Sequence, residues 1–167
     1  EDYPSVELIL NQVNSGYFKG LNIGINYLRA QFPTMNHIVI GNNDLVFPVD
    51  FISKVANKKI IFDQYAVISP DLITLDGVHQ NPHVIEKISK TREIIYDLYY
   101  ANYTLSLAIG FLANFTKKFT DRKDELQYEV VQTIYQGYGA CYIVGPLFFE
   151  NYEQLWAPTF LMGEELF

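Results

Sequence analysis

The sequence predicts an α/β fold in which a mostly parallel sheet is flanked by helices. Two short apolar runs at residues 37–40 and 65–69 have the length and β-branched composition of buried strands. Residues 22–31 and 48–57 place apolar side chains at helical spacing before and between those runs. Such alternation of helices and strands favours right-handed crossovers and parallel strands.

The first half of the chain gives the clearest pattern. Residues 6–10 predict a short strand, and the polar residues 11–20 predict a loop. The helix expected at 22–31 ends before Pro33, and the strand expected at 65–69 is stopped by Pro70. These boundaries give the order strand, helix, strand, helix, strand.

The second half is less regular. Residues 82–100 predict a helix with an apolar stripe, whereas residues 105–119 fit a helix and a strand equally well. Residues 126–134 and 138–144 are expected to be strands. We therefore expect a single domain over residues 1–167.

Composition limits the classes of function. The formal net charge of −7 disfavours nucleic acid as a partner, because phosphate binding needs clustered Lys and Arg. An anionic ligand would instead need a metal ion or oriented backbone amides. Cys141 is the only cysteine, which excludes an intrachain disulfide and favours a reducing, cytoplasmic location. The apolar stretch 105–115 is shorter than the roughly 20 residues that span a bilayer.

A carboxylate follows the strand expected at 37–40. Asn42, Asn43 and Asp44 lie where that strand opens into a loop, and such loops bind ligands in open parallel sheets. Asp44 would suit Mg²⁺ or Mn²⁺ that also takes diphosphate oxygens. The alternative is that Asp44 only begins a turn.

Further candidates are spread along the chain. The loop from Asn14 to Gly24 is rich in glycine and precedes a helix, which suits an anionic ligand, or it simply caps that helix. Glu164 and Glu165 follow an aromatic stretch and could include a general base, or form a solvated helix start. Trp156 could stack on a sugar or belong to the core. Cys141 is a poor candidate nucleophile in its apolar setting, and the three histidines show no metal-ligand spacing.

Taken in order, these segments resemble glycosyltransferase family 2, the inverting enzymes with a GT-A fold, and in particular bacterial enzymes that build surface polysaccharides. The resemblance rests on five segments in the family's order, which together cover nearly the whole chain. They are Asn14 to Gly24, Ile38 to Asp44, Pro70 with Asp76-Gly77, Gly139-Ala140-Cys141, and Phe160 to Glu165. The family's first nucleotide-binding strands have no counterpart here, so we expect an internal fragment of a GT-A domain.

The resemblance implies roles for particular residues. Asp44 would coordinate the divalent metal, with Asn42 in the place of the family's commoner first Asp. Glu165 would be the catalytic base, with Glu164 beside it. The donor nucleotide would lie against the loop that leads into the first helix and against the turn after the strand at 37–40, at Asn14, Gly16, Tyr17, Lys19, Gly20, Asn22 and Asn43. The acceptor would lie near Gly139, Ala140, Cys141 and Trp156.

The implied reaction is a metal-dependent transfer of a sugar, with inversion, from a nucleotide-diphosphate donor to a glycan or lipid-linked saccharide. Two other functions stay open: a nucleotidyltransferase of similar fold, and a degenerate domain that binds glycan or a partner protein. The aromatic stretch 96–119 is expected to be core, but it also suits a surface for peripheral membrane association or for a homodimer.

Overall fold

The computed structural model describes residues 6–87, 89–115 and 127–160. The chain forms two compact units, one made of residues 1–70 and 138–167 and the other of residues 71–137. The sequence predicts one domain, whereas the contacts divide the chain at residues 70 and 138.

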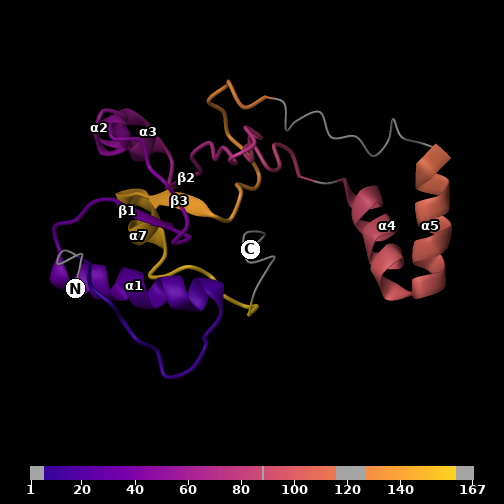
Figure 1. Cartoon of the computed structure of the whole chain (residues 1–167), viewed down its shortest axis with the longest axis horizontal. Coiled ribbons are helices and arrows are strands. Elements are labelled where there is room, and N and C mark those ends of the chain that lie inside the picture. The colour runs from indigo at the N-terminus through magenta and orange to yellow at the C-terminus, as the bar shows by residue number, and fades with distance from the viewer. Residues whose placement is uncertain (1–5, 88, 116–126, 161–167) are drawn as a thin grey trace. The chain divides into compact units, whose positions relative to one another are not determined.

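The first unit contains a three-stranded sheet with the strand order β1-β3-β2 (Figure 1). Its strands are β1 (Ile38–Gly41), β2 (Val67–Ile68) and β3 (Cys141–Val144). Both outer strands pair antiparallel with β3, so that Ile38 and Val67 flank Val144 from opposite sides. It follows that β1 and β2 run in the same direction.

The prediction of a mostly parallel sheet is therefore wrong. Helices do connect β1 to β2, and the two strands do point the same way, as the sequence pattern indicates. However, β3 enters from the opposite direction and occupies the position between them, so every strand pair in the described sheet is antiparallel. A strand–helix–strand pattern constrains the direction of two strands but does not say whether a third strand lies between them.

The helices of the first unit are α1 (Tyr17–Gln31), α2 (Phe51–Ala56), α3 (Lys59–Gln64) and α7 (Pro146–Asn151). α1 begins five residues before the predicted start, and Phe18 in its first turn is buried together with Ile25, two turns later. The helix predicted at 48–57 is observed as two short helices. Residues 6–10 were expected to be a strand, but their backbone is irregular and their side chains are exposed.

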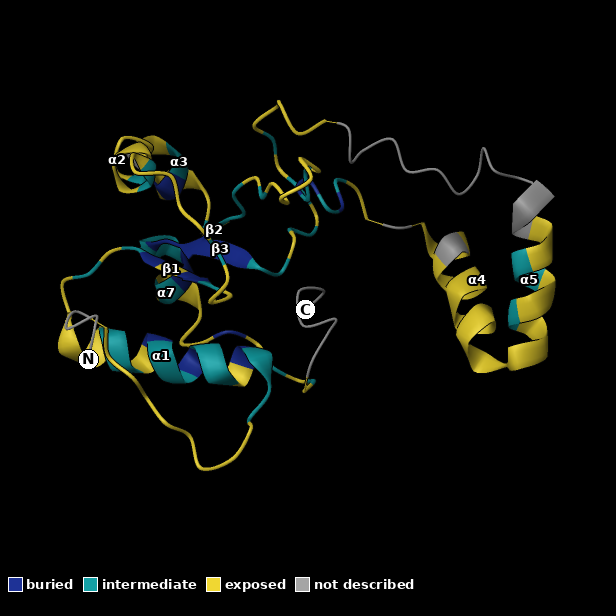
Figure 2. Ribbon diagram, in the orientation of Figure 1, coloured by how far each residue is buried: buried dark blue, intermediate teal, exposed yellow. Residues whose placement is uncertain are grey.

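The core of this unit forms where α1 packs on one face of the sheet. Ile38 and Ile40 of β1 share that face with Tyr142 and Val144 of β3, their cross-strand partners. Four further buried side chains complete the cluster: Phe18, Ile25, Phe148 and Leu155. All four residues of β3 are buried, as expected for a central strand (Figure 2).

The second unit contains α4 (Lys90–Ala101) and α5 (Tyr103–Phe115), which form a helical hairpin. The ambiguity at residues 105–119 is thus resolved as a helix over its described part. Residues 127–134, expected to belong to a strand, contain none; instead Val84 and Gln136 form an isolated antiparallel bridge. Among the described residues, no helix is long and apolar enough to cross a bilayer.

One buried amide joins α1 to the segment after α7. Asn22 Nδ2 donates to the carbonyl oxygen of Leu155 at 2.9 Å, and the Leu155 amide donates to Asn22 Oδ1 at 2.8 Å. Both groups are removed from water, so losing the side chain would leave two backbone groups unsatisfied. This pair holds the chain against α1 on its way to Phe160.

We expect the Asn22→Ala variant to lower the free energy of unfolding by about 2–4 kcal/mol, because each orphaned buried group costs about 1–3 kcal/mol. The matched control is Asn26→Ala, since Asn26 is exposed on the same helix. Its effect should stay within about 0.5 kcal/mol. Urea denaturation measures both, and equal stabilities of the two variants would contradict the role given to Asn22.

Candidate functional site

The candidate site lies at one edge of the sheet in the first unit. Because β1 and β2 run the same way, their carboxyl ends lie at this edge, beside the beginning of β3. The Asn42 amide donates to the carbonyl oxygen of Ala140 at 2.9 Å, which continues the β1–β3 ladder by one step. The turn that carries Asp44 and the Gly139–Cys141 segment are therefore neighbours.

Tyr17 joins two more of the predicted segments to this edge. Its hydroxyl donates to the carbonyl oxygen of Gly139 at 2.8 Å, and its amide donates to the carbonyl oxygen of Phe160 at 3.1 Å. Tyr17 is the first residue of α1 and follows the glycine loop directly. One residue thus connects the loop, the start of β3 and the segment that leads to Glu164.

Gly16 allows the closest of these approaches. Its φ of 91° lies in the left-handed region, and its amide donates to Asn14 Oδ1 at 3.1 Å. A Cβ atom at this position would lie 2.3 Å from the carbonyl oxygen of Phe160. Only glycine lets the loop and the Phe160 segment meet at this distance. Gly41 makes a similar approach on the other side, where a Cβ atom would lie 2.4 Å from the Ala140 oxygen.

The remaining residues that were predicted to bind the donor nucleotide differ in how far they are exposed to solvent. Lys19 and Asn43 are exposed, and Gly20 lies within the first turns of α1 with open space where a Cβ would be. The side chain of Asn22 is buried, and its amide bonds to the backbone of Leu155. The observed contacts of Asn22 therefore hold the fold together.

The acceptor-side residues also divide. Gly139 and Ala140 are half-buried at the sheet edge. Cys141 is fully buried, and burial raises the pKa of its thiol to about 11, so that it stays protonated at neutral pH. That protonation agrees with the sequence-based argument against Cys141 as a nucleophile. Trp156 is 64% exposed and does not belong to the core.

Asp44 is exposed on the turn after β1, between Asn43 and Leu45. Among the residues that the structure describes, no three His, Cys, Asp or Glu side chains gather closely enough to hold a metal by themselves. Mg²⁺ that accompanies a nucleotide is usually held by one or two carboxylates together with substrate phosphates and water. Asp44, Asn42 and Asn43 are the oxygen-bearing side chains of this turn that could hold such a cation.

The predicted catalytic residues Glu164 and Glu165 lie outside the described residues. Asp76 and Gly77 lie in the second unit, where Gly77, with a φ of 84°, forms a turn. Asp76 accepts a hydrogen bond from Thr74 Oγ1 at 2.5 Å, which lowers the pKa of the Asp76 carboxyl group. In the same unit, His79 Nδ1 lies 2.6 Å from Asp71 Oδ2, and this contact was not anticipated from sequence.

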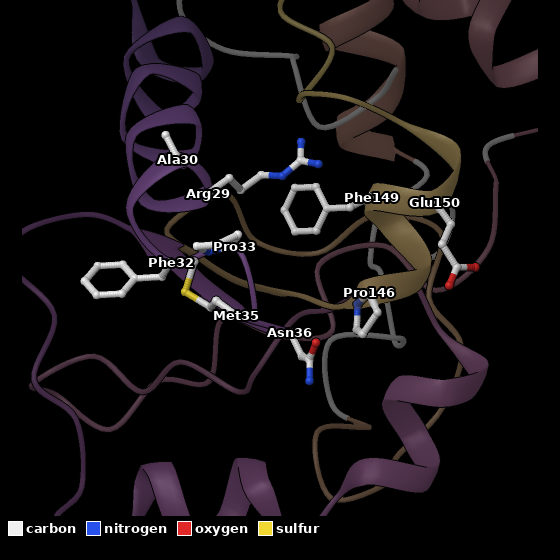
Figure 3. A pocket seen from close by; sticks show the side chains of 9 residues that line it. All are labelled: Arg29, Ala30, Phe32, Pro33, Met35, Asn36, Pro146, Phe149 and Glu150. Carbon is white, nitrogen blue, oxygen red and sulfur yellow. The ribbon is translucent and has the colours of Figure 1, made fainter.

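A cavity of about 530 Å³ lies elsewhere in the first unit (Figure 3). It is bounded by the end of α1, the residues just before β1 and the beginning of α7, so it lies at the opposite end of the sheet from Asp44. The Arg29 guanidinium lies over the ring of Phe149, 4.6 Å from its centroid, and donates to the Glu153 carbonyl oxygen at 3.1 Å. None of the sequence-predicted site residues lines this cavity.

Sequence reasoning found the residue types at the sheet edge but missed the role of Tyr17 as their connector. The signal was weak, since a tyrosine after glycine predicts no particular partner.

Comparisons with models of protein families, with curated proteins and with solved structures find no match for this chain.

The contact at Gly16 gives a test of this geometry. We expect Gly16→Ala to destabilise the protein by more than about 2 kcal/mol, because it combines a strained positive φ with a collision against backbone. Gly24→Ala is the matched control, since a Cβ atom there meets nothing within 4 Å. In the interior of a helix that change should stabilise by about 0.5–1 kcal/mol. Urea denaturation should therefore give changes in the free energy of unfolding of opposite sign for the two variants. A Gly16→Ala variant of unchanged stability would show that the loop does not meet Phe160 in this way.

Proposed function

We propose that the first unit carries the site of a divalent-metal-dependent, inverting glycosyltransferase. The donor would be a nucleotide-diphosphate sugar, and the acceptor a hydroxyl group of a glycan or of a lipid-linked saccharide. The observation that carries the proposal is the contact of Tyr17 with both Gly139 and Phe160, because it brings segments far apart in the sequence to the edge where Asp44 lies.

The chemistry of this edge suits an anionic donor in a protein of strongly negative charge. Asp44 would hold the metal ion, with Asn42 and Asn43 beside it, and that ion would neutralise charge on the diphosphate leaving group. The beginning of the fifteen-residue helix α1, where partial positive charge is concentrated, is held beside this edge by the bond from Tyr17 to Gly139. Exposed Lys19 lies within the first turn of α1 and could add a full positive charge.

The proposed base is Glu165, which follows Phe160 by five residues. Five residues span at most about 18 Å when fully extended, so the chain length keeps Glu165 within that distance of Phe160. In the proposed reaction Glu165 takes the proton of the acceptor hydroxyl as its oxygen attacks the anomeric carbon. The bond from that carbon to the diphosphate breaks on the opposite face, which inverts the configuration.

Donor binding can be tested without an acceptor. A thermal-shift panel of uridine, guanosine and thymidine diphosphates, each with and without Mn²⁺, should show stabilisation by one nucleotide that depends on the metal. The Asp44→Asn variant should lose the Mn²⁺-dependent part of the shift. Asp63→Asn is the control, since Asp63 is an exposed acid in the same unit. If no nucleotide stabilises the protein with Mn²⁺, the donor site is not where we place it.

The catalytic step has a separate test in a turnover assay. Glu165→Gln should lower turnover by at least ~100-fold, since a general base contributes about 10²–10⁴ in rate. It should leave the rise in melting temperature caused by the nucleotide unchanged. Glu164→Gln is the neighbouring control and should change turnover much less. Release of nucleoside diphosphate supports sugar transfer, whereas release of pyrophosphate would indicate a nucleotidyltransferase. Normal turnover of Glu165→Gln would exclude this residue as the base.

A further inference from the structure

The cavity between the end of α1 and the beginning of α7 is not used by the proposed reaction, since it lies at the opposite end of the sheet from Asp44 (Figure 3). Its volume of about 530 Å³ lies in the range of pockets that bind small molecules. Arg29, in the last turn of α1, is the cationic side chain of its lining. The surroundings of this arginine indicate which class of ligand the cavity suits.

Two contacts hold the Arg29 guanidinium group in one orientation. It lies over the ring of Phe149, 4.6 Å from the ring centroid, and Nη1 donates to the carbonyl oxygen of Glu153 at 3.1 Å. A guanidinium group carries five N–H donors in a planar fork, so most of its donors remain after the bond to Glu153. Because the group is already oriented, it has less conformational freedom to lose when it binds an anion.

The positive charge of Arg29 is not neutralised within the part of the chain that the structure describes. No carboxylate in residues 6–87, 89–115 or 127–160 forms an ion pair with it. Glu150 lines the same cavity, but Figure 3 shows this side chain pointing away from the guanidinium group. In a chain of net charge −7, an oriented and unpaired arginine at a cavity favours an anionic ligand.

The remainder of the lining suits a ligand that also has an apolar part. Six of the nine lining residues have apolar side chains, and they are Ala30, Phe32, Pro33, Met35, Pro146 and Phe149. The ring of Phe32 is 55% exposed, and Met35 beside the same cavity is half-buried. Phenylalanine rings and methionine sulfur both pack favourably against an aromatic ring. An aromatic body with one anionic group therefore matches this lining.

The anionic group is better matched by a carboxylate than by a phosphate. A planar carboxylate accepts two parallel N–H bonds from one guanidinium group. It carries a single negative charge, whereas a phosphate monoester carries about 1.5 to 2 at neutral pH. The additional charge would be repelled by Glu150 and by the acidic chain as a whole.

We propose that this cavity binds a small aromatic carboxylate. The carboxylate accepts hydrogen bonds from the guanidinium donors of Arg29 that the Glu153 carbonyl leaves over, and the aromatic ring packs against Phe32 and Met35. The ligand is distinct from the nucleotide donor proposed for the Asp44 edge.

Ligand-observed NMR titration of the full chain with phenylacetate, 3-phenylpropionate and indole-3-acetate tests the proposal. We expect at least one of the three to bind with a dissociation constant of about 1 mM or lower. Its neutral amide has the same ring but no charge, and it should bind at least about tenfold more weakly, because hydrogen bonds between charged groups are the stronger ones. Acetate, which lacks the ring, should also bind at least about tenfold more weakly.

Substitutions in the lining should change affinity in opposite directions. Arg29→Met keeps an apolar stem beside Phe149 but removes the charge, so it should weaken carboxylate binding at least about tenfold and leave binding of the amide unchanged. Glu150→Gln removes a negative charge from the lining and should strengthen carboxylate binding about twofold. Lys58→Met is the matched control, because it removes an exposed cation of the same unit that does not line the cavity. It should change the affinity less than about twofold.

Three results would overturn the proposal. They are the absence of binding by all three carboxylates, equal affinity for a carboxylate and its amide, and unchanged carboxylate binding by Arg29→Met. Circular dichroism shows whether each variant is folded. If Arg29→Met does not fold, the comparison of carboxylate with amide and the direction of the Glu150→Gln effect still decide. None of these measurements involves a nucleotide, so the proposed enzymatic function stands or falls separately.

Discussion

The arrangement of the first unit depends on the backbone ladder on both sides of β3. This strand pairs with β1 through four residues and with β2 through two, and all of its side chains are buried. A central strand has no exposed edge, so its position is difficult to change without losing both ladders. Because β3 runs against its neighbours, its first residue lies beside the last residue of β1. This antiparallel pairing makes Gly139, Ala140 and the Asp44 turn neighbours.

The second requirement is that the chain after α7 stays against α1. The Asn22–Leu155 amide pair fixes one point of that path, and the Tyr17–Phe160 bond fixes another. Between these points the segment leaves Trp156 exposed although its backbone is held on both sides.

Sequence reasoning was most accurate where local pattern and tertiary context agree. The strand at 37–40 was predicted within one residue because its length and β-branched composition are typical of a short buried strand. Residues 6–10 have a comparable apolar composition, yet they form no strand, since strand formation requires a partner that local composition does not specify. The prediction of a mostly parallel sheet failed for the same reason. Pairing between β1 and β3 joins residues about a hundred positions apart, and no periodicity encodes that choice.

The candidate site shows the same division between residue type and contact. Asp44, Gly16 and Gly139 were identified because turns, glycines and carboxylates have recognisable local patterns. The sequence did not reveal that Asn22 would bond to Leu155, because a buried amide and a ligand-binding amide have the same sequence signature. Burial distinguishes them: an amide whose donor and acceptor both meet backbone groups has little left for a ligand. By that criterion the exposed Asn43 is a better candidate for donor contact than Asn22, and the Gly16 amide, which already donates to Asn14, is likewise committed to the fold.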